Sequence, residues 1–206
     1  MRKILLLAVA CSTLAVVGTA AAVKPVAVSI SLSRSTVVYG GTVKVSGVVS
    51  SHQAGTKVRV LARASGASTF SEIASVDTTT GGAWNYTASP VILTRYQAQV
   101  ANVMSRVVTV KVRPKIVLEL MSRTARRGTF KVTVNGDRSF TGKYVLVQRL
   151  TSSGPTTLKH VKLGADSSAT FSIRLPQRRT RVRVVMSTSQ AAPGYIAGYS
   201  NVWSSH

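Results

Sequence analysis

Residues 41–46 read GTVKVS, and residues 128–133, 87 positions further along the chain, read GTFKVT. Both stretches alternate apolar and polar side chains, which is the period of a β-strand with one buried face. The same spacing relates Gly55 to Gly142, and each of these glycines leads into a stretch with valines at alternate positions. Matches at a constant spacing indicate an internal repeat. The sequence therefore predicts two tandem β modules.

The rest of the chain after residue 23 shows the same alternation in short runs, separated by Gly, Ser, Asn and Pro, and no long stretch has a helical period. We therefore predict an all-β protein with module 1 at residues 24–112 and module 2 at residues 115–206. Strands are expected near residues 27–33, 42–49, 56–63, 70–77, 83–88, 94–101 and 105–112, and near 116–122, 129–135, 143–150, 157–163, 169–174, 180–187 and 199–204. About seven short strands in each module are typical of two antiparallel sheets packed as a sandwich. The residues expected in the cores are Trp84, Tyr86, Tyr96, Phe130, Phe171 and Ile173, and the alternative is that the aromatic rings among them form a sugar-stacking platform.

The modules are joined by VRPK at residues 112–115. Pro114 fixes its own φ angle and favours an extended conformation for Arg113. We expect a short, stiff joint and an end-to-end arrangement of the two modules.

Several stretches carry a resemblance to a known class of module: VYGG at residues 38–41, AGTKVRV at 54–60, GGAW at 81–84 and TRYQA at 94–98. With them the chain resembles the immunoglobulin-like modules of secreted and surface proteins of Gram-positive bacteria, particularly actinobacteria. The resemblance covers both repeats and implies two tandem immunoglobulin-like antiparallel β-sandwiches that serve as spacer, adhesion or envelope-binding modules. The paired cysteines of antibody domains are lacking, and a fold alone does not transmit a function.

Residues 1–22 have the features of a secretory signal peptide: Arg2 and Lys3, then an apolar run, then small residues that end at Ala22. We expect cleavage after Ala22 and a protein that is secreted to the extracellular space or the cell envelope, with the membrane touched only through the signal peptide. The alternatives are a retained membrane anchor, for which the apolar run is short, and lipidation at Cys11. Cys11 is the one cysteine of the chain, so a cleaved protein would need no disulfide.

Charge is the strongest functional signal in the sequence. The chain has 27 Lys and Arg against 5 Asp and Glu, for a formal net charge of +22, and residues 114–206 hold 15 of these cations and 3 acids. Strand alternation places the cations on outer faces and in turns, where they can contact an anionic polymer. The predicted polyanion-binding residues are Arg178, Arg179, Arg181, Arg183, Arg123, Arg126, Arg127 and Lys131. The alternative is a charge that only solubilises the protein.

Aromatic residues alternate with turn residues near the end of module 2, in APGYIAGYSNVW at residues 192–203. Tyr195 and Tyr199 are candidate ligand contacts there if their rings are exposed on a loop. The alternative is that both rings pack within the last hairpin.

No chemistry beyond binding is predicted. Five acids, three histidines and one cysteine provide neither a catalytic cluster nor a metal site, so we expect no enzyme activity, no metal and no cofactor. The loop at residues 136–143 (GDRSFTGK) departs from the phosphate-binding loop in its spacing and predicts a hairpin turn. The expected partners are an anionic cell-envelope polymer or another surface protein, in an adhesion or spacer role, with no specific nucleic acid.

Overall fold

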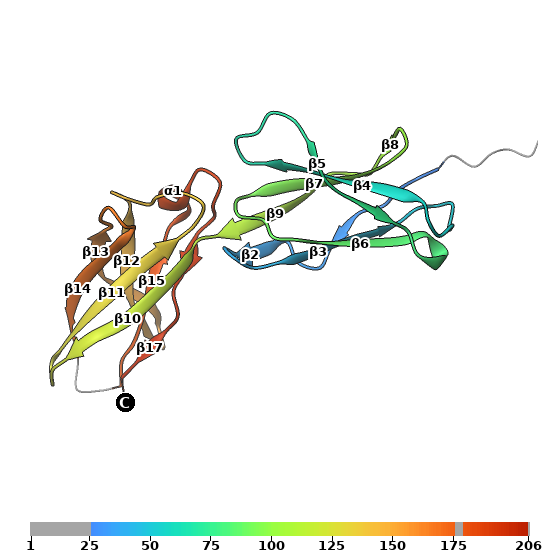
Figure 1. Cartoon of the computed structure of the whole chain (residues 1–206). Helices are drawn as coiled ribbons and strands as arrows, with labels where there is room; N and C mark the ends of the chain where they lie inside the picture. The colour runs from blue at the N-terminus through green and yellow to red at the C-terminus, as the bar shows by residue number, and fades with distance from the viewer. Residues whose placement is uncertain (1–25, 176–178, 206) are drawn as a thin grey trace, which may run out of the picture.

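The computed structural model describes residues 26–175 and 179–205 and is nearly all β, as expected (Figure 1). We call residues 26–113 the first half and residues 114–205 the second half. The strands of the first half are β1 Ser31–Leu32, β2 Thr36–Val38, β3 Val43–Val48, β4 Lys57–Ala64, β5 Ser71–Asp77, β6 Ala83–Ala88, β7 Thr94–Val100, β8 Val103–Met104 and β9 Val108–Arg113. Those of the second half are β10 Lys115–Arg123, β11 Arg127–Asn135, β12 Tyr144–Thr151, β13 Gly154–Lys162, β14 Ser168–Arg174, β15 Arg181–Met186, β16 Gly198–Tyr199 and β17 Trp203–Ser204. The predicted signal peptide and Cys11 lie outside the described residues.

Each half holds a three-stranded sheet and a larger one. In the first half the sheets run β1-β3-β6 and β2-β9-β7-β4-β5, with β8 on β7, and in the second half they run β10-β11-β14 and β13-β12-β15-β16, with β17 on β15. The strand pairs are antiparallel except for β2 beside β9. Among the described residues, every paired strand has its partner in the same half.

The tandem repeat predicted from the 87-residue spacing is confirmed by the strand register. In the first half the pairing of β4 with β5 is interrupted by a bulge directly after Val60, and in the second half the pairing of β12 with β13 is interrupted directly after Val147. Gly55 and Gly142 both have a left-handed backbone, with φ of +77° and +75°. Their N–H groups donate to the carbonyl oxygens of Thr78 and Leu163 at 2.8 and 2.9 Å. Glycine adopts this φ without strain, which explains why it precedes the strand in both copies.

The cores contain the aromatic residues that the alternation placed there, except that Tyr86 is half-buried and packs against the core. Trp84, Tyr96, Phe130 and Phe171 are all at most 4% exposed. Along β11 each second residue is buried, and Phe130 stacks on Phe171 at a centroid distance of 5.9 Å and meets the edge of Trp203 at 5.1 Å. The exclusion of these aromatic and branched side chains from water is the main stabilising contribution to such a fold.

Several segments differ from the expected strands. The strand expected near residues 27–33 is reduced to β1, and β2 follows it outside the expected range, because the chain crosses here from the smaller sheet, where β1 pairs with β3, to the larger one, where β2 pairs with β9. The last expected strand is divided into β16 and β17, which pair with different parts of β15. The structure also has a 3₁₀ turn at Thr80–Gly82 and a short helix, α1, at Thr188–Ala191. Helices of three or four residues are too short to leave a periodic signal.

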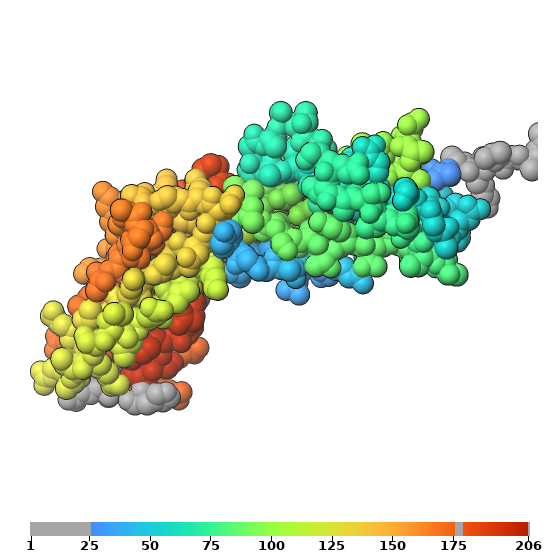
Figure 2. Space-filling model, viewed as in Figure 1, coloured from blue at the N-terminus to red at the C-terminus, as the bar shows by residue number. Residues whose placement is uncertain are grey.

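The two halves meet end to end (Figures 1 and 2), and hydrogen bonds join them. Only Pro114 separates β9 from β10. The N–H of Leu93 donates to the carbonyl oxygen of Gly194 at 2.8 Å, and the N–H of Ile196 donates to that of Val112 at 3.0 Å. The joint therefore combines a one-residue connection with direct backbone contacts between the halves. Within residues 26–175 and 179–205, no helix is both long and apolar enough to span a bilayer.

Candidate anion-binding surface

The β10–β11 hairpin places three arginines at the end of the second half that points away from the first half (Figure 1). Arg123 ends β10, Arg127 begins β11, and Arg126 lies in the turn between them; all three are exposed. The backbone holds this turn in place, because the N–H of Leu175 donates to the carbonyl oxygen of Arg126 at 2.9 Å. The three side chains are thus presented by a fixed backbone.

More arginines reach the same end from the neighbouring strands. Arg174 ends β14 and lies directly opposite Arg127 across the sheet. Arg179 and Arg181, at the start of β15, are exposed, whereas Arg178 lies outside the described residues. We call Arg123, Arg126, Arg127, Arg174, Arg179 and Arg181 the distal arginine cluster. Like charges directly opposite in a sheet are destabilising, so an anion that binds between them is favoured.

The three acids of the second half lie away from this cluster. Asp137 and Asp166 lie in loops near the end that faces the first half: the N–H of Asp137 contacts the Tyr195 hydroxyl at 2.6 Å, and the turn after Asp166 bonds Val134 near the end of β11. Glu119 lies halfway along β10, opposite Lys131. The second half is therefore polarised, with cations alone at its far end among the described residues.

Lys131 does not belong to the distal arginine cluster, although the alternation of β11 predicts it as a polyanion-binding residue together with these arginines. It is half-buried, has Glu119 opposite it, and helps to lower the pKa of Asp166. The main cause of that lowered pKa is the hydroxyl of Ser168, which donates to the Asp166 carboxylate at 2.6 Å. Two nearby acids thus offset the charge of Lys131.

Arg183 lies on the same face of β15 as Arg181, as alternation predicted, but its side chain is held by neighbours. Its Nε donates to Oε1 of Gln148 at 3.1 Å, and its guanidinium lies 5.1 Å from the ring centroid of Tyr199. Arg113 approaches the same ring at 5.2 Å. Tyr199, which is 48% exposed, therefore contacts two guanidinium groups by cation–π interactions. Arg183 is less free to bind an external anion than Arg181.

Tyr195 corrects an expectation, because its ring is not exposed on a loop tip. It is 3% exposed and packs edge-on against Phe140 at a centroid distance of 5.6 Å. Its hydroxyl accepts from the N–H of Asp137 and donates to the carbonyl oxygen of Val91 in the first half at 2.7 Å. Burial raises the pKa of this hydroxyl. Tyr195 is therefore part of the joint between the halves and leaves no ring face for a ligand.

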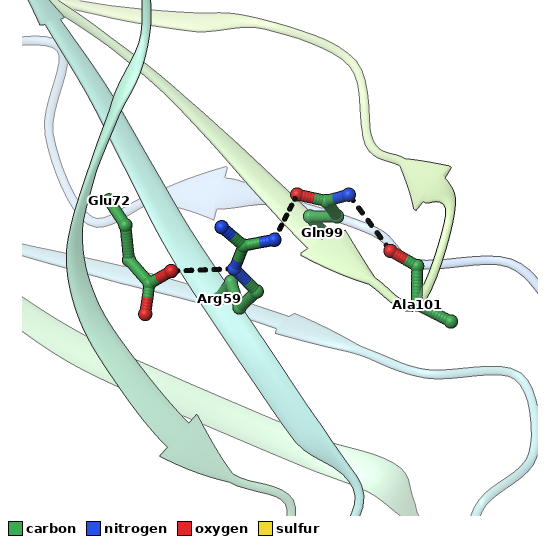
Figure 3. Close-up of polar contacts among 4 residues, drawn as sticks. All are labelled: Arg59, Glu72, Gln99 and Ala101. Carbon is green, nitrogen blue, oxygen red and sulfur yellow. Dashed lines mark hydrogen bonds and ion pairs between the residues drawn. The ribbon is translucent and has the colours of Figure 1, made fainter.

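In the first half, two outward-facing cations form salt bridges with acids. Arg59 donates from Nε to Glu72 at 2.6 Å and from its terminal nitrogen to Oε1 of Gln99 at 3.2 Å, and Gln99 in turn donates to the carbonyl oxygen of Ala101 (Figure 3). Lys57 forms a second salt bridge, to Asp77, at 3.2 Å. Both salt bridges of the described residues lie on β4 and β5. The first half thus pairs two of its outward cations with acids, and among the described residues no such salt bridge forms in the second half.

Three further cations, Arg149, Lys159 and Arg174, are not among the residues predicted from the sequence. Arg174 could have been found, because it ends an expected strand beside the basic turn. Arg149 and Lys159 could not have been found, because their positions in a groove between the two sheets follow from the pairing of β12 with β13 and β15, which the sequence does not show. Within the described residues, no group of three or more His, Cys, Asp or Glu side chains could hold a metal ion.

Comparisons with known proteins identify no family. No model of a protein family matches the chain, and no curated protein matches it. Among solved structures, the chain is similar to the crystal structure of a tetra-tandem repeat in the extending region of a large adhesion protein, at 14% sequence identity and a TM-score of 0.35. The match covers 87% of this chain, which spans about half of that one, 49%.

Proposed function

We propose that each half is an immunoglobulin-like sandwich. The order of strands supports this: in the second half the first, second and fifth strands form one sheet, and the fourth, third, sixth and seventh form the other. Constant-type immunoglobulin domains likewise place the first, second and fifth strands in one sheet and the third, sixth and seventh in the other, although their fourth strand joins the first of these sheets. The first half has the same arrangement, with its first strand divided between the sheets.

We further propose that the protein is a secreted, non-enzymatic component of the cell envelope that binds anionic polymer through the distal arginine cluster. The observation that carries this proposal is the polarisation of the second half: six arginines at one end, and its three acids elsewhere. Cations spread over a hairpin and two strand ends suit a ligand whose charge repeats along a chain, because each contact releases counterions without a unique geometry.

The signal peptide expected at residues 1–22 would bring the protein outside the cell, which limits the polyanions that it can meet. Outside the cell, the phosphates and carboxylates of wall and surface polymers are the abundant repeating anions. The short, hydrogen-bonded joint fits this role, because it would hold the second half at a fixed distance from whatever the first half contacts.

Retention on insoluble bacterial cell walls tests the proposal. The purified protein should be retained at about 50 mM salt and released as salt rises, since screening weakens exposed charges. A distal triple variant, Arg123→Gln with Arg126→Gln and Arg127→Gln, should be released at lower salt. Retention that is independent of salt, or equal for both proteins, would contradict electrostatic binding at this end.

A second candidate function, adhesion to another surface protein, is favoured by exposed apolar residues on β10. Leu120 and Met121 are 38% and 59% exposed on this edge strand. Exposed apolar side chains on a sheet edge are typical of protein contacts. Met121→Lys would abolish such adhesion and preserve the retention on cell walls, whereas the distal triple variant would have the opposite effects.

A further inference from the structure

A groove opens between the two sheets of the second half, at the side where β13 and β14 form their edges. Its volume is about 590 Å³. It is lined by Arg149, Leu158, Lys159, Ser172, Ile173 and Arg174. Three of these residues are cations and none is an acid, so the groove concentrates positive charge between partly apolar walls.

Arg149 points into the sandwich, where a sheet ordinarily places an apolar residue. It follows Val145 and Val147, which are fully buried, in the same alternating phase of β12, and it lies opposite the buried Val182 of β15. Its Nε is buried and has no hydrogen-bond partner among the described residues. A buried donor without an acceptor is unfavourable, so an acceptor that enters the groove would stabilise it.

Lys159 and Arg174 bring two more cations to the same groove from other strands. Lys159 shares the phase of the buried Val161 on β13 but is itself exposed, because the smaller sheet ends at β14 and does not cover it. Arg174 approaches from β14, on the opposite side of the groove. Cations on three strands thus converge on one opening, which distinguishes the groove from a solvated outer face.

The first half shows that the fold does not require these cations. Lys159 pairs with Val147 immediately before the bulge, and the residue in that place in the first half is Ala74, which pairs with Val60. By the same register, Arg149 corresponds to Ala62. Ala62 and Ala74 pack against the hydrophobic core. The second half therefore has charge where its structural equivalent has ordinary core packing.

We propose that this groove binds the terminal phosphate of a small phosphomonoester or of a polymer end. A guanidinium presents a planar set of donors that matches phosphate oxygens, and three cations suit a dianion better than a carboxylate. Leu158 and Ile173 would contact the carbon skeleton next to the phosphate. A volume of about 590 Å³ is that of a small-molecule site, larger than phosphate alone needs. The proposal does not depend on the function assigned to the distal arginine cluster.

NMR titration of the purified protein with inorganic phosphate and with phenyl phosphate, at constant ionic strength, tests the proposal. We expect saturable shifts of the backbone amides of Leu158, Ser172 and Ile173, with phenyl phosphate binding more tightly. Benzoate should bind at least tenfold more weakly than phenyl phosphate. The absence of saturable shifts, or equal binding of benzoate, would overturn the proposal.

The double variant Arg149→Ala with Lys159→Ala supplies the control for folding, because it installs the residue type that the first half carries at both positions. It should retain a cooperative thermal transition and lose at least tenfold in affinity for phenyl phosphate. The distal triple variant should bind phenyl phosphate within about twofold of the wild type. Unchanged affinity in the double variant, or an equal loss in the triple variant, would show that the groove is not the site. Retention on cell walls is measured separately, so failure of one proposal is distinguishable from failure of the other.

Discussion

The salt dependence of polyanion binding gives the sharpest test of the distal arginine cluster. If each of its six arginines neutralises one phosphate of a flexible polyphosphate chain, a contribution of about 0.7 per charge predicts a slope of roughly −4 in a plot of log affinity against log salt. A rise from about 50 to about 200 mM salt then weakens binding about 300-fold. The distal triple variant, with three charges left, should have a slope of roughly −2 and lose only about 20-fold over the same range.

The assay is binding to immobilised long-chain polyphosphate at several salt concentrations. The three substituted side chains are exposed, and the hydrogen bonds that hold the turn use backbone atoms and Thr124, so the variant should fold. Its matched control removes three exposed cations from the first half, Arg34→Gln with Lys44→Gln and Arg95→Gln. The control has the same net charge and should keep a slope close to the wild-type value. Equal slopes for both variants would refute a localised cluster and indicate binding through the overall charge.

Three further predictions concern stability. Tyr195→Phe removes the hydroxyl that bonds the N–H of Asp137 and the carbonyl oxygen of Val91, and should lower the free energy of unfolding by about 1–3 kcal/mol in urea titrations. An unchanged free energy of unfolding would show that this hydroxyl does not stabilise the contact between the halves. Phe130→Ala creates a cavity in the core of the second half and should cost about 3–5 kcal/mol by the same measurement, whereas a cost below about 1 kcal/mol would contradict the packing described. Hydrogen bonds lower the pKa of Asp166, so its ionised form contributes stability above the ordinary pKa of about 3.9, and this stability is lost as the pH falls through the lowered pKa. In thermal melts at several pH values, Asp166→Asn should therefore flatten the acid side of the curve of stability against pH. An unaltered curve would contradict the role given to Asp166.

The strands and the repeat could be predicted because they depend on local patterns. Val43 and Val45 alternate with polar residues, and the structure buries both. Gly55 and Gly142 mark equivalent turns because each needs a left-handed backbone. Such features are set by a few neighbouring residues, so a single sequence reveals them.

The candidate site could be predicted only in part, because side-chain partners depend on distant segments. Arg181 and Arg183 have the same alternating phase, yet only Arg183 meets Gln148, a residue 35 positions away. The hydroxyl of Tyr195 bonds Val91, which is 104 positions away. Composition gives the surplus of cations, but pairing across strands decides which of them remain available to a ligand.

The duplication makes the first half an internal reference for the second. Both halves have the bulge at the same place, on β5 where it pairs with β4 and on β13 where it pairs with β12, and both have the glycine turn, before β4 and before β12, so both satisfy the same backbone requirements. The first half satisfies them with Ala62 packed against the core and with Arg59 paired to Glu72. Because the same fold forms with alanine at the positions of Arg149 and Lys159, these two cations are not explained by folding, and repulsion between them opposes it. A property that a fold does not need, and that reduces its stability, is typical of a binding site.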